Sequence, residues 1–240
     1  MAYGPVFRIL GVAVIATFGL VSVATAGADP DGRVPTVEAY RDVAGQRVEY
    51  QGREALALEL TSEEQAQQLA GAGGNRPTFA LLPGKFRDGV IEVGVAAELN
   101  GRGGPDARGF VGVVFRLGED ERFEAVYLRM SNGTLNRPAP PAPRDVRAIQ
   151  YIAHPEFHFP VSRAEAPGIY ERAAPVAVGR WHRLRLEITG TRLVASIDGE
   201  TVLELNDLRL VRPGRLGLWV GDGTRAYFSN LKVKVAVVRQ

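Results

Sequence analysis

The sequence predicts an all-β protein of two antiparallel sheets packed face to face, with at most one short helix. Runs of alternating apolar and polar residues follow one another along the chain, with tight polar turns between them. About ten such runs with almost no helical pattern are typical of a two-sheet sandwich. The expected strands are residues 47–51, 54–60, 78–82, 89–99, 109–117, 123–130, 148–153, 180–189, 192–197, 201–205, 215–220 and 226–238.

Two local signals support this interpretation. Asp198-Gly199 separates two alternating runs, and both residue types tolerate the positive φ angles of a tight hairpin turn. Residues 61–70 are the one helical candidate, with Thr61 or Ser62 as N-cap and glutamates in the first turn. We expect this segment to be a short surface helix.

The first 26 residues indicate a signal peptide. Arg8 supplies the one positive charge, an apolar stretch follows it, and Ala24-Thr25-Ala26 gives the small-x-small pattern of a cleavage site. We expect cleavage after Ala26, a linker over residues 27–35 and a single domain over residues 36–240. The protein would then be periplasmic or secreted in a bacterium, with no stable membrane insertion after cleavage. Retention of the leader as an anchor is the alternative, although its apolar stretch is short for spanning a bilayer.

Composition excludes several function classes. The chain has 29 basic and 27 acidic residues and a net charge of +2, so no basic surface for nucleic acid is expected. It has no cysteine, so export brings no disulfide and stability rests on the core. We find no P-loop, dinucleotide fingerprint or defensible Ser-His-Asp spacing, and we expect no cofactor.

The last quarter of the chain carries a family resemblance. Trp181-His-Arg-Leu-Arg-Leu-Glu-Ile188 and Val194-Ala-Ser-Ile-Asp-Gly-Glu200 resemble a hairpin of laminin-G-like jelly rolls. Gly214-Arg-Leu-Gly-Leu-Trp-Val-Gly-Asp-Gly223 and Tyr227-Phe-Ser-Asn-Leu-Lys-Val233 resemble their closing strands, which the 3-keto-disaccharide hydrolase-like domain family shares. The resemblance covers residues 180–235 and implies a concanavalin A-like jelly-roll sandwich.

That resemblance implies three functions, because the fold hosts lectins, glucanases and interaction modules. The first is exported carbohydrate binding, with an oligosaccharide on one sheet face. The alternative is a glycoside hydrolase-type enzyme acting on a di- or oligosaccharide. The third is a structural envelope module that contacts other proteins. Glucanases of this fold carry Glu-x-Asp-x-x-Glu on one strand, and this chain lacks that motif; its acidic residues 119–121 fall in a turn.

Strand parity predicts which side chains form the sugar site. Side chains alternate between faces, so Val111, Val113, Phe115 and Leu117 would enter the core and Arg116 would face outward. Aromatic rings stack on sugar rings, while guanidinium and amide groups bond sugar hydroxyls. The expected site residues are Arg116, Tyr127, Arg129, Gln150, His154 and Trp219. In the alternative, Arg116 and Arg129 pair with carboxylates such as Glu124 or Glu171.

His154-Pro155-Glu156-Phe157-His158 is the most concentrated polar group in the chain. His154 is the candidate catalytic residue if the protein is an enzyme. His154, Glu156 and His158 are weak metal candidates, because on an extended strand the two histidine Cα atoms would lie about 13 Å apart. The prolines favour a loop, which could supply the bend. We assign no metal site.

Overall fold

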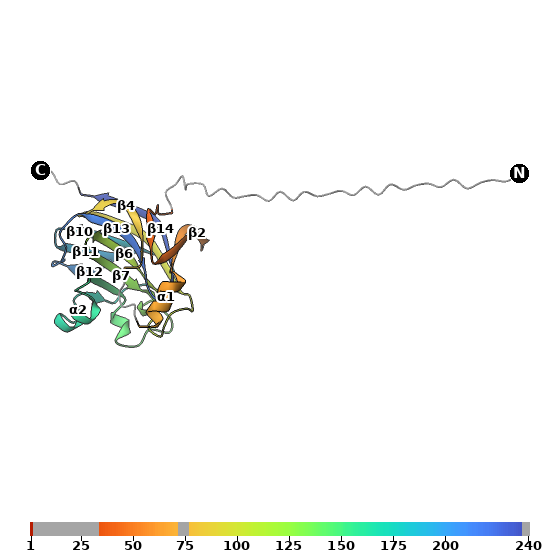
Figure 1. The fold of residues 1–240 in the computed structure, drawn as a ribbon. Helices are drawn as coiled ribbons and strands as arrows, with labels where there is room; N and C mark the ends of the chain where they lie inside the picture. The colour runs from red at the N-terminus through yellow and green to blue at the C-terminus, as the bar shows by residue number, and fades with distance from the viewer. Residues whose placement is uncertain (2–33, 72–76, 237–240) are drawn as a thin grey trace.

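Two seven-stranded antiparallel sheets form a sandwich (Figure 1). The computed structural model describes residue 1, residues 34–71 and residues 77–236 of the 240-residue chain. The predicted two-sheet antiparallel fold is confirmed, in an arrangement consistent with a jelly roll. Residues 2–26 of the predicted signal peptide and residues 27–33 of the predicted linker lie outside the described residues.

The order of the strands within each sheet differs from their order in the chain. From one edge to the other, sheet A contains β1 (Ala39–Arg41), β4 (Phe79–Phe86), β13 (Gly214–Val220), β6 (Phe110–Leu117), β7 (Phe123–Arg129), β8 (Ile149–His154) and β9 (Glu171–Arg172). Sheet B contains β12 (Glu200–Leu205), β11 (Arg192–Ile197), β10 (His182–Thr189), β5 (Gly89–Leu99), β14 (Thr224–Val235), β3 (Arg53–Leu60) and β2 (Val43–Tyr50). The residues of the family resemblance form β10 to β14.

The core lies between the sheets and follows the predicted alternation. On β6, Val111, Val113 and Phe115 point into it, and Phe115 is 0% exposed. From sheet B, Leu184 and Leu186 of β10 meet the same core. Burial of apolar area of this kind is the main favourable contribution to folding, so one core joins the two sheets.

The predicted parity fails at the end of β6. Arg116 has a φ of +56°, and the register with β13 shifts between Arg215 and Gly217. Such a bulge inserts one extra residue and reverses the faces beyond it. Leu117 therefore packs in the apolar cluster on the outer face of sheet A rather than in the core. The prediction for Leu117 was wrong for that reason.

Two short helices accompany the sheets. The helix α1 (Ser62–Leu69) is the predicted one, and the Thr61 side chain caps it by accepting a hydrogen bond from the Glu64 amide at 3.2 Å. The helix α2 (Phe159–Glu165) was not predicted, because Pro160 suggested a loop. Proline is tolerated in a first helical turn, where its missing N–H has no partner to lose. Within the described residues, no helix is long and apolar enough to cross a membrane.

Candidate functional site

A pocket of about 640 Å³ opens on the outer face of sheet A. Phe110, Tyr127 and Trp219 form its floor. Its walls come from segments outside the sheet: the end of α1, the glycine-rich loop before β6, the 3-10 turns η1 (Met130–Asn132) and η2 (Arg144–Val146), α2 and the turn between β13 and β14. Both helices and the irregular loops therefore frame one face of the sandwich.

A glycine explains how the floor is built. Trp219 and Tyr127 lie on either side of Gly112 in the sheet, because β6 pairs with β13 on one side and with β7 on the other. A Cβ on Gly112 would lie 2.5 Å from the Tyr127 Cβ. Without it, the Tyr127 and Trp219 rings approach to 4.7 Å between centroids, and Phe110 meets both edge-on. The result is a continuous aromatic floor.

Arg129 joins the floor to the next strand. Its Nη2 donates to the Tyr127 hydroxyl at 2.9 Å and to the Gln150 Oε1 at 3.0 Å. Its guanidinium carbon lies 5.0 Å from the centre of the Tyr127 ring. Burial raises the pKa of Tyr127 and keeps its hydroxyl neutral. Four of the predicted site residues, Tyr127, Arg129, Gln150 and Trp219, thus lie on one face, with Gln150 buried behind Arg129.

One carboxylate holds three arginines of the pocket in place. Glu171 is 5% exposed and accepts two hydrogen bonds from Arg163, at 2.8 and 2.7 Å. Arg147 lies 3.1 Å from it and Arg129 lies 3.7 Å from it. The alternative pairing of Arg129 with Glu171 is therefore present. It fixes the guanidinium groups without removing them from the pocket wall.

Two further arginines, Arg108 and Arg144, form a part of the pocket wall that no ion pair joins to Glu171. Arg144 donates to Asn132 at 2.9 Å and to Ser131 at 3.2 Å. Arg108 pairs with Asp106 at 3.1 Å, but the Asp106 side chain is 97% exposed, so this pair is weak. Burial and the nearby charge of Arg108 lower the pKa of Arg144. This wall is therefore electropositive.

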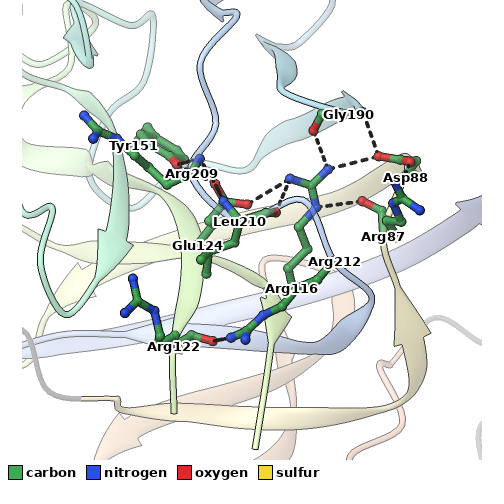
Figure 2. A network of polar contacts seen from close by, with 10 residues as sticks. All are labelled: Arg87, Asp88, Arg116, Arg122, Glu124, Tyr151, Gly190, Arg209, Leu210 and Arg212. Atoms are coloured by element: carbon green, nitrogen blue, oxygen red, sulfur yellow. Dashed lines mark hydrogen bonds and ion pairs between the residues drawn. The ribbon is translucent and has the colours of Figure 1, made fainter. Parts of the chain in front are cut away.

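The predicted role of Arg116 as an outward-facing residue was wrong. The bulge turns its side chain into a buried polar network, shown in Figure 2. There it pairs with Glu124 at 3.0 Å and Asp88 at 2.9 Å. It also donates to the backbone carbonyls of Arg87, Gly190 and Leu210. The predicted alternative, in which Arg116 pairs with Glu124, is therefore present. Arg116 stabilises the fold and does not contribute to the surface of sheet A.

His154 is the last residue of β8, whereas Gln150 lies near the start of that strand. Its partner across the sheet is Phe123, on which its ring stacks at 4.7 Å, and it does not line the pocket. The chain bends after it, so that His154 Nδ1 and His158 Nε2 are 3.1 Å apart. Glu156 pairs with Arg122 instead. No group of three or more potential metal-ligating side chains occurs among the residues that the structure describes.

Sequence reasoning missed most of the pocket wall. Phe110 belongs to a predicted strand and has the same outward parity as Gly112. Arg108, Arg144, Arg147 and Arg163 lie in segments without strand periodicity. The one available signal was the three-residue spacing of Arg144 and Arg147, which places both on one side of a 3-10 turn.

Comparison with known proteins adds distant likenesses only. No family model and no curated protein matches the sequence. Among solved structures, the chain is similar to the carbohydrate-binding module CBM66 from Bacillus subtilis, with a TM-score of 0.49 and 16% identity, over 80% of this chain and 94% of that one. It is also similar to a Bacillus subtilis protein of unknown function with a galectin-like fold, with a TM-score of 0.49 and 15% identity, over 85% and 92%. A lichenase from a mouse hindgut metagenome gives a TM-score of 0.42 and 13% identity, over 74% and 78%.

Proposed function

We propose that this chain is an exported carbohydrate-binding protein that holds an oligosaccharide in the pocket on the outer face of sheet A. The observation that supports this most is the aromatic floor of Phe110, Tyr127 and Trp219 beneath guanidinium donors. Aromatic rings contact the apolar faces of sugar rings, and forked donors bond their hydroxyls. The pocket volume falls within the range of about 300–1,000 Å³ that is usual for small-molecule sites.

The carboxylates near this pocket favour binding over hydrolysis. Glycoside hydrolysis needs one carboxyl group as acid and a second as base or nucleophile. Both oxygens of Glu171 contact arginines. Both oxygens of Asp222 accept hydrogen bonds, from the Gln65 side chain and the Gly104 amide. Asp106 points into solvent. Among the described residues of this pocket, no enclosed carboxylate without a partner is available to act as the acid, or as the base or nucleophile.

The test is a glycan-array screen, followed by calorimetry with the saccharide that binds. Phe110→Ala is the variant of choice, because Phe110 is only half-buried, whereas Tyr127 and Arg129 hold hydrogen bonds of the fold itself. Loss of one aromatic contact of about 1.4 kcal/mol corresponds to tenfold weaker binding.

The matched control is Tyr40→Ala, which removes an exposed aromatic ring that does not line the pocket. It should leave affinity unchanged. A turnover assay on the same saccharides should give no product. Wild-type affinity in folded Phe110→Ala protein would contradict the proposed site, and hydrolysis of the bound saccharide would contradict a purely binding role.

A further inference from the structure

Charge around the pocket is unevenly balanced. Five arginines line it: Arg108, Arg129, Arg144, Arg147 and Arg163. Glu171 lies within ion-pair distance of three of them. Asp222 accepts hydrogen bonds from an amide side chain and from a backbone amide. That leaves Arg108 paired with the solvent-exposed Asp106, while Arg144 forms no ion pair with a carboxylate of the described residues.

Arg144 is the most informative of these residues. Its Nε and Nη2 atoms are held by Asn132 and Ser131, so its guanidinium is positioned by neutral groups. No acceptor among the described residues takes the hydrogens of its Nη1 atom, and no carboxylate there pairs with it. Arg144 lies close enough to Arg108 for their charges to repel, and both groups line the same pocket. Two partly buried like charges are unfavourable unless an anion offsets them.

The loop that carries Arg108 is built against the rest of the pocket. A Cβ on Gly103 would lie 2.5 Å from the Gly223 Cα, so the loop packs backbone on backbone against the β13–β14 turn. The Gly104 amide donates a hydrogen bond to the Asp222 carboxylate at 3.1 Å, and the Gln65 side chain of α1 donates another to the same carboxylate at 2.6 Å. The position of Arg108 is therefore set by the fold.

We infer that the saccharide bound in this pocket is acidic, and that Arg108 and Arg144 bind its carboxylate or sulfate group. This inference rests on the proposed function and names its ligand class. Guanidinium groups match the planar carboxylate and the sulfate with two parallel hydrogen bonds. The aromatic floor contacts the sugar ring, while the electropositive wall selects the charged substituent.

The experiment uses pairs of saccharides that share one sugar backbone and differ in their anionic groups. Calorimetry compares tetragalacturonate with its methyl ester, and a chondroitin sulfate tetrasaccharide with the unsulfated form. In at least one pair, the more highly charged member should bind about tenfold or more tightly, since hydrogen bonds to charged groups are the stronger class. Arg144→Gln and Arg108→Gln should each reduce that preference to less than about threefold. The control Arg192→Gln, on β11 and 58% exposed, should keep it.

The outcomes separate this inference from the function on which it rests. Equal affinity within both pairs, with Phe110→Ala still weakening binding, overturns the acidic ligand and leaves sugar binding intact. If a tetraglutamate peptide binds as tightly as the acidic saccharide, the site responds to charge alone, and the inference that its ligand is a saccharide is overturned. Binding of no saccharide at all overturns the proposed function itself.

Discussion

Arg116 offers the sharpest stability prediction. Its side chain is 0% exposed, and its five N–H groups have five acceptors: Glu124, Asp88 and three backbone carbonyls. Replacement by Met keeps most of the volume but leaves Glu124 buried without its cation. Removing one partner of a buried ion pair costs about 3–5 kcal/mol. We expect Arg116→Met to lower the free energy of unfolding by that amount.

Urea denaturation followed by circular dichroism measures this loss. The control is Arg192→Met, which breaks an exposed pair with Glu204 and should cost less than about 1 kcal/mol. Adding Glu124→Gln to Arg116→Met removes the uncompensated charge and should recover part of the lost stability. The reasoning is refuted if Arg116→Met costs no more than the control.

Three further predictions concern the core, a buried histidine and the N-terminus. Phe115→Ala should cost about 3–5 kcal/mol in urea denaturation, since the ring is fully buried in the core; a loss below about 1 kcal/mol would contradict its placement. Burial and the neighbouring His154 lower the pKa of His158 from 6.5 to about 4. Between those pH values the unfolded chain binds a proton that the folded protein does not, so stability should decrease as the pH is lowered, by at most about 1.4 kcal/mol per pH unit. His158→Gln should reduce that slope, and an unchanged slope would count against the buried histidine. N-terminal sequencing of exported protein should begin at Gly27; intact leader in the membrane fraction would contradict cleavage.

The fold was predictable from sequence because alternation with period two is visible without any tertiary information. Residues 89–99 and 192–197 match β5 and β11 at both ends. The Asp198-Gly199 turn has the expected positive φ at both positions, 52° and 97°. The same parity placed Tyr127 and Trp219 correctly on the outer face.

The errors have two physical origins. Parity holds only while the pleat is regular, and the positive φ of Arg116 is not encoded in any alternating pattern. The walls of the pocket come from loops and from two short helices, where the period-two alternation of strands gives no information. Arg144 and Arg163 line the same pocket as Arg129 because the chain folds those segments back over sheet A. Their convergence is a tertiary property.

Intrinsic fluorescence tests the location of the site most directly. The protein has two tryptophans: Trp219 lines the pocket on sheet A, and Trp181 packs against Tyr50 on the outer face of sheet B. In Trp181→Phe protein, where Trp219 is the one tryptophan left, titration with the bound saccharide under selective tryptophan excitation should give a saturable change whose midpoint equals the calorimetric Kd. In Trp219→Phe protein the emission of Trp181 should stay constant. A saturable change in Trp181 with none in Trp219 would place the saccharide on the opposite sheet and contradict the account.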